Sequence, residues 1–105
     1  MTPPTDTSRY IGQRPTARIV ADNGRVYCAF HYCMSEYAIC ARSPGASETG
    51  LTYLGSIIRW AGGDHDWGCY WQAIGGMEGG PFRGVRSALA GFLVWLGRTG
   101  EAVQA

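Results

Sequence analysis

The dipeptide Asn23-Gly24 constrains the fold more than any other feature of this chain, because it separates two apolar runs, 16–21 and 26–32. Asn and Gly tolerate the positive φ angles of a two-residue type I′ turn, which joins adjacent antiparallel strands. The pattern therefore predicts a β-hairpin. Side chains alternate between the two faces of a hairpin, so its register decides what each face carries.

A second reversal at Met34-Ser35 adds a third strand to the predicted sheet. In the register that the two turns imply, Ile19 lies opposite Cys28, and Cys28 lies opposite Ala41. One face is then apolar or aromatic throughout and comprises Ala17, Ile19, Ala21, Val26, Cys28, Phe30, Tyr32, Tyr37, Ile39 and Ala41. The opposite face is mixed and comprises Arg18, Val20, Tyr27, Ala29, His31, Cys33, Ala38, Cys40 and Arg42.

Two helices and one more strand are predicted in the second half of the chain. Apolar residues at helical spacing favour a helix over 51–61, and alternating aromatic residues favour a strand over 67–74. The Gly-rich run 75–80 is typical of a loop, and Pro81 fits the first turn of a helix that reaches Leu96. We therefore expect an α+β fold, with a small antiparallel or mixed β-sheet of three N-terminal strands plus one later strand, covered on one face by two helices.

A length of 105 residues suits a single hydrophobic core. The composition predicts a flexible N-terminal arm over 1–15, a single α+β domain over 16–100 and a frayed tail over 101–105. The arm has no apolar segment of the signal-peptide type, and no apolar run is long enough to span a membrane. These features predict a cytoplasmic protein with no membrane partner, whose four cysteines are reduced.

The charged residues exclude several classes of enzyme. Nine basic residues, all of them Arg, stand against eight acidic residues. Without Lys the chain has no Schiff-base lysine, no pyridoxal-phosphate anchor and no P-loop lysine. A net charge of +1 also disfavours strong non-specific binding to nucleic acid. With no catalytic motif found, we expect a protein that is not an enzyme and that holds no cofactor and no metal.

Two clusters contain the residue types of a catalytic or metal site. In the predicted register Cys28 points away from His31, Cys33 and Cys40, which disfavours a shared zinc ion. The run Asp64-His65-Asp66 combines carboxylates with an imidazole in a Gly-flanked loop, where it could bind a divalent ion or act as general acid and base. This loop carries the alternative hypothesis of a metal-dependent or hydrolytic enzyme.

The aromatic surplus favours a contact surface instead, because Trp, Tyr and Arg are enriched at interaction hot spots. The segment around the fourth predicted strand is richest in these types, and its candidate partner-binding residues are Arg59, Asp64, Asp66, Trp67, Tyr70 and Trp71. Arg83 and Arg86, near the start of the last helix, suit a nucleic-acid-binding alternative. A homodimer through the small residues Ser87 and Gly91 is a further alternative.

These patterns lead to one main hypothesis. The chain is expected to be a small binding protein that acts by protein–protein interaction with a protein or ribonucleoprotein partner. Its size and lack of motifs match the profile of small phage or mobile-element inhibitors of bacterial defence, so an anti-CRISPR-like inhibitor is the specific form of the hypothesis.

Overall fold

The computed structural model describes residues 3–43, 50–62 and 65–98. Six strands follow one another in a single antiparallel sheet, in which each strand pairs with the next along the chain. The elements in chain order are a short 3₁₀-helix η1 (Thr7–Tyr10), β1 (Ala17–Val20), β2 (Val26–Cys33), β3 (Glu36–Arg42), β4 (Thr52–Gly62), β5 (His65–Ala73), β6 (Glu78–Phe82) and the helix α1 (Val85–Arg98).

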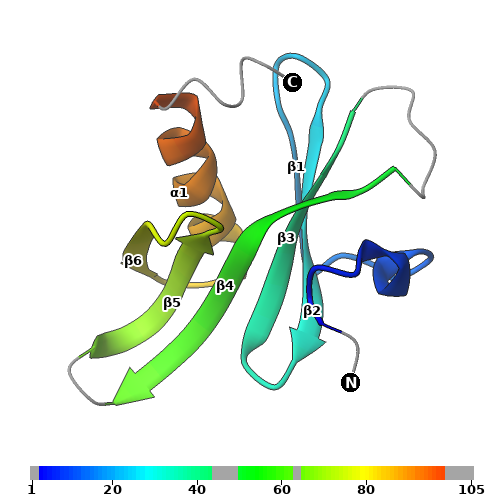
Figure 1. Cartoon of the computed structure of the whole chain (residues 1–105). Helices are drawn as coiled ribbons and strands as arrows, with labels where there is room; N and C mark the ends of the chain where they lie inside the picture. Colours follow the sequence, from blue (N-terminus) through cyan, green and yellow to red (C-terminus); the bar gives the residue numbers. More distant parts are fainter. Residues whose placement is uncertain (1–2, 44–49, 63–64, 99–105) are drawn as a thin grey trace.

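The sheet curls into a half-barrel around α1. The helix contacts both edge strands, β1 and β6, as well as β2, β4 and β5, so it lies on the concave face (Figure 1). Apolar side chains from the strands and the helix fill the space between them. The largest fully buried members of this core are Tyr27, Ile39, Ile57, Leu89, Phe92 and Leu96.

The predicted fold class is wrong, because the chain is mostly β with one α-helix rather than four strands under two helices. The segment 51–61, predicted as a helix, belongs to β4. Ile57 of this strand faces the core while Ile58 is only partly buried, which is the alternation of a strand. Gly55 lies against β5, where an added Cβ would come within 2.2 Å of the Gln72 carbonyl oxygen. These β-branched and glycine residues disfavour a helix, and pairing on both edges of the strand outweighs its helical periodicity.

The Gly-rich run 75–80 forms a turn and the start of β6 instead of a long loop. Pro81 lies within this edge strand, so its predicted place in the first helical turn is also wrong. The last helix is confirmed, but it begins at Val85. The Ser87 hydroxyl accepts a hydrogen bond from the Gly84 amide at 3.1 Å, which satisfies one of the free donors at the start of the helix.

The first hairpin is confirmed, but its predicted turn and register are wrong. The Gly24 amide donates to the Ala21 carbonyl at 2.8 Å, and the Ala21 amide donates to the Arg25 carbonyl at 2.9 Å. The loop therefore has three residues, and within it only Gly24 has a positive φ, +85°. This is the geometry of a type I turn followed by a bulge, and it shifts the register by one residue, so that Arg18 pairs with Cys28.

The second hairpin also departs from the predicted register. Cys33 pairs with Glu36 across the Met34-Ser35 turn, as expected, but a bulge between His31 and Cys33 shifts the rest of the ladder by one residue. Cys28 then pairs with Cys40. The two shifts exchange the faces predicted for the side chains of β2. Tyr27 and Ala29 face α1, while Cys28 and Phe30 face the opposite side.

A second apolar cluster therefore covers part of the convex face, comprising Tyr10, Cys28, Phe30, Ala38 and Cys40. Tyr10 belongs to the segment 3–15, which composition predicts as a flexible arm. In the structure this segment carries η1, on the side of the sheet away from α1 (Figure 1). The Tyr10 ring is 1% exposed and stacks on Phe30 with ring centroids 5.1 Å apart.

Candidate functional site

Two of the predicted partner-binding residues lie on the surface at one end of the sheet. Trp67, near the start of β5, is 71% exposed, and Arg59 of β4 is also exposed. The Arg59 amide donates to the Ser35 carbonyl at 2.8 Å, which holds the β2–β3 turn against β4. In Figure 1 both hairpins, β2–β3 and β4–β5, end at the lower edge of the view.

Two other predicted contact residues, Trp71 and Tyr70, do not join this surface. Trp71 is 5% exposed and packs in the core, with its ring centroid 5.5 Å from Phe92 and 5.1 Å from Trp95. Tyr70 is 9% exposed, so little of its ring is available to a partner. Asp64 and the side chain of Asp66 lie outside the described residues.

Sequence reasoning missed two further exposed apolar side chains at this end of the sheet. Met34, in the β2–β3 turn, is 91% exposed, and Trp60 is 44% exposed. Trp60 pairs with Gly68, which follows Trp67 directly, so the side chains of Trp60 and Trp67 project from opposite faces of the sheet. We call Met34, Trp60 and Trp67 the hairpin end. Trp60 is not among the predicted contact residues because the segment 51–61 is predicted to be a helix, in which Trp60 would widen the buried apolar stripe.

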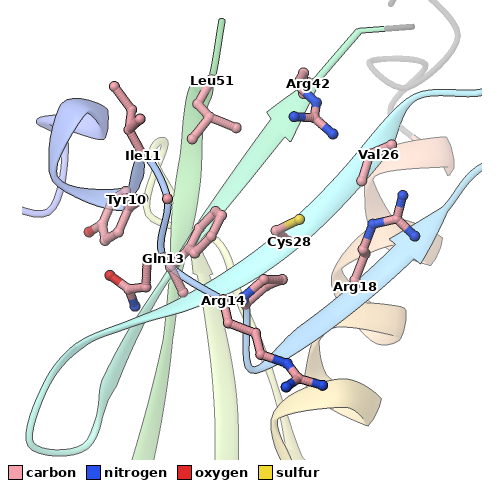
Figure 2. Close-up of a pocket in the computed structure, with 12 residues that line it drawn as sticks. Tyr10, Ile11, Gln13, Arg14, Arg18, Val26, Cys28, Arg42 and Leu51 are labelled. Carbon is pink, nitrogen blue, oxygen red and sulfur yellow. The ribbon is translucent and has the colours of Figure 1, made fainter. Parts of the chain in front are cut away.

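A second candidate site is a pocket of about 260 Å³ on the convex face, between the N-terminal segment and β1–β3. We call it the arginine pocket, because Arg14, Arg18 and Arg42 lie around its floor at Cys28 (Figure 2). The remaining lining residues are Tyr10, Ile11, Gly12, Gln13, Pro15, Val26, Phe30 and Leu51. The corrected register brings the site together, since the predicted one placed Cys28 on the face opposite Arg18 and Arg42.

The N-terminal wall of this pocket is held to β2 by several contacts. The Gln13 side-chain amide donates to the His31 carbonyl at 3.0 Å, and the Thr16 amide donates to the Ala29 carbonyl at 2.8 Å. The Arg9 guanidinium lies 4.3 Å from the centre of the Tyr32 ring, a cation–π distance. These contacts order a segment whose composition alone does not predict order.

The pocket is electropositive. None of the described residues that line it is acidic. Asp6 is the nearest carboxylate along the N-terminal segment. Its Oδ1 accepts hydrogen bonds from the backbone amide and the hydroxyl of Ser8, at 3.2 and 2.6 Å. Burial raises the pKa of the Cys28 thiol above its usual value, and the charges of Arg18 and Arg42 partly oppose that shift.

The predicted placement of Cys28 and Cys40 on opposite faces is wrong, because the two residues are cross-strand neighbours on one face. Even so, across residues 3–43, 50–62 and 65–98 no three His, Cys, Asp or Glu residues group closely enough to hold a metal ion. All four cysteines are free thiols. Burial raises the pKa of Cys40 to about 12, so this thiol is protonated and weakly nucleophilic at neutral pH.

His65 and Asp66 do not lie in the predicted Gly-flanked loop between a helix and a strand, because both belong to β5. His65 begins β5 and pairs with Gly62 of β4. Asp64 and the side chains of His65 and Asp66 lie outside the described residues, so their chemistry remains a prediction.

Arg83 and Arg86 are exposed near the start of α1 and border a shallow hollow with Gly84, Ser87 and Ala90. No aromatic ring is among the described residues of that hollow, so it lacks the stacking partner of the nucleic-acid hypothesis. Arg86 also donates to the Arg18 carbonyl of β1 at 2.9 Å, a contact within the fold.

The predicted dimer contact at Gly91 is occupied by the chain itself. A Cβ at this position would lie 2.2 Å from the Phe82 ring. Gly91 therefore lets β6 approach α1 closely, and its small size is explained without a second copy.

Comparisons with protein families, curated proteins and solved structures found no match to this chain. The anti-CRISPR-like inhibitor profile rested on a motif-free α+β chain, and the mostly β fold with one helix removes that basis. α1 has 14 residues, fewer than the roughly 20 that cross a bilayer, and the described residues contain no other helical candidate for a membrane span.

Proposed function

We propose that the protein is a non-catalytic binding module that contacts a protein partner through the hairpin end. The exposure of Met34, Trp60 and Trp67 at the same end of the sheet carries this proposal. Large apolar side chains exposed at one end of a sheet leave apolar area in water, and burial against a partner would remove that area from water. Trp is also the residue type most enriched at hot spots, where burial against a partner gives most of the affinity.

The arrangement of the two hairpins supports the same proposal. The hydrogen bond from Arg59 to Ser35 and the pairing of Trp60 with Gly68 hold the three side chains on ordered strands and a tight turn. Such a surface loses little conformational entropy when it binds, which favours affinity. Arg59 adds a cation at the edge of the apolar group, where it can pair with a carboxylate of the partner.

The test compares Trp67→Ala and Met34→Ala with Ile74→Ala. Ile74 is 70% exposed, similar to Trp67, but follows the opposite end of β5 and provides a matched control. We expect one protein captured from a nuclease-treated lysate to be retained by the wild type and Ile74→Ala. With purified proteins, calorimetry should show binding at least about 10-fold weaker for Trp67→Ala and Met34→Ala.

Circular dichroism melts should agree among the three variants, because all three side chains are exposed. Equal binding by Trp67→Ala and Ile74→Ala would overturn the proposal. Sedimentation velocity covers self-association: a wild-type dimer that dissociates in Trp67→Ala would identify the partner as a second copy and overturn the proposal of a separate protein.

A further inference from the structure

The positive charges of the arginine pocket are not paired with an acidic side chain in the described part of the chain. Arg14 and Arg18 are exposed and Arg42 is partly buried, and the guanidinium groups of all three have no hydrogen bond or ion pair within the described part of the chain. Arg18 and Arg42 lie beside the floor at Cys28 on β1 and β3, whereas Arg14 lines the margin and its side chain points away from Cys28 (Figure 2). Like charges held near one another repel, so an anion placed between them would be stabilised.

The floor and wall of the pocket are apolar. Cys28 and Phe30 of β2 are 8% and 5% exposed, and Leu51 and Ile11 complete this side. A cavity of roughly 150 Å³ holds a benzene molecule. The volume of about 260 Å³ therefore has room for a charged group together with one ring or a short alkyl chain.

The charge of the arginines favours a phosphate over a carboxylate. A carboxylate carries one negative charge and suits one guanidinium fork. A phosphate monoester carries a charge of about −1.5 to −2 at pH 7 and presents three acceptor oxygens, so guanidinium groups from separate segments can meet different oxygens. Arg18 and Arg42 come from the strands on either side of β2 and lie beside Cys28, which suits such an anion (Figure 2).

We propose that the arginine pocket binds a small organic phosphate, with the phosphate beside Arg18 and Arg42, the charge of Arg14 at its margin, and its apolar part over Cys28 and Phe30. The site lies on the convex face by the N-terminal segment and is separate from the hairpin end. It goes beyond the proposed function, since a module that contacts a protein through one surface also holds a ligand at another.

The experiment is calorimetric titration of the protein with phenyl phosphate, whose ring and dianion match the two halves of the pocket. We expect saturable one-to-one binding, tighter than that of inorganic phosphate. Arg18→Gln and Arg42→Gln should each weaken it by about 10-fold or more, because each removes a charge-assisted hydrogen bond. Arg83→Gln, which changes an exposed arginine near the start of α1, should bind as the wild type does.

Arg14→Gln separates a loss of binding from a loss of folding, because Arg14 is exposed and lies on the N-terminal segment rather than in a strand. It should weaken binding while leaving the circular dichroism melt unchanged. Amide shifts in an NMR titration with phenyl phosphate should centre on Arg18, Cys28 and Arg42. Shifts centred elsewhere, or equal affinity in all four variants, would overturn the proposal.

Two further arms separate the possible sources of the phosphate. Inorganic phosphate that binds as tightly as phenyl phosphate would overturn the role of the apolar floor. A short single-stranded oligonucleotide that binds far more tightly than phenyl phosphate, with affinity falling steeply with salt, would assign the arginines to a nucleic-acid backbone and overturn a small-molecule site.

Discussion

At the scale of single residues, Gly91 and Gly97 offer a matched pair within α1. A Cβ at Gly91 would meet the Phe82 ring at 2.2 Å, whereas a Cβ at Gly97 meets nothing within 4 Å. We expect Gly91→Ala to lower the free energy of unfolding by about 1–3 kcal/mol through overpacking. Gly97→Ala should raise it by up to about 1 kcal/mol, because Ala favours the helix.

Urea unfolding of both variants checks this pair. If the two changes shift the midpoint equally and in the same direction, Gly91 is not the contact between β6 and α1 that the structure assigns.

Ionisation of the Tyr10 phenol makes the stability of the N-terminal segment, which forms one wall of the arginine pocket, depend on pH in the alkaline range. Burial raises its pKa from 10.0 to about 12, and its hydroxyl donates to the Pro4 carbonyl at 3.1 Å. Because the folded state favours the neutral phenol, this stabilisation is complete below pH 10.0 and is lost as the pH rises through about 12. Cys40 acts in the same direction, since its pKa rises from 9.0 to about 12.

We therefore expect the free energy of unfolding to fall between pH 9 and about pH 12, the window set by these two groups. Tyr10→Phe keeps the stacking on Phe30 but removes the ionisable group, so the fall should be smaller. Urea unfolding at several pH values measures this, and an identical fall in Tyr10→Phe would assign the pH dependence to other groups.

At the scale of elements, a substitution at Gly55 distinguishes the predicted helix over 51–61 from the observed strand β4. In an exposed stretch of helix, Gly55→Ala would stabilise the protein. In β4 the new Cβ would lie 2.2 Å from the Gln72 carbonyl oxygen, so the strand must separate from β5. We expect Gly55→Ala to lower the free energy of unfolding by about 2 kcal/mol or more, measured by urea unfolding.

The elements also show where sequence patterns succeed and where they do not. The first two hairpins and α1 were predictable, because turn residues and a strong helical stripe act locally. The register was not, since the three-residue loop 22–24 and the bulge between His31 and Cys33 each shift the pairing by one residue, and no residue type demands either. The arginine pocket could not be predicted either, because it depends on Arg18, Cys28 and Arg42 sharing a face.

At the scale of the whole molecule, the exposed and buried aromatic rings could not be separated from sequence. Trp67 and Trp71 lie four residues apart in one strand, yet one is 71% exposed and the other 5%. Both face the same side of the sheet by alternation. Only the position of α1 makes the difference, because Trp71 packs on Phe92 and Trp95 of that helix and Trp67 lies beyond its reach.

The position of α1 also sets an order of events during synthesis. All six strands leave the ribosome before the helix does, and each can pair with its immediate predecessor as it emerges. The contact of Arg86 with the Arg18 carbonyl then joins segments 68 residues apart. A chain cut short before α1 exposes the apolar inside of its half-barrel, so the cell's chaperones and proteases can tell an unfinished copy from a complete one by surface chemistry alone.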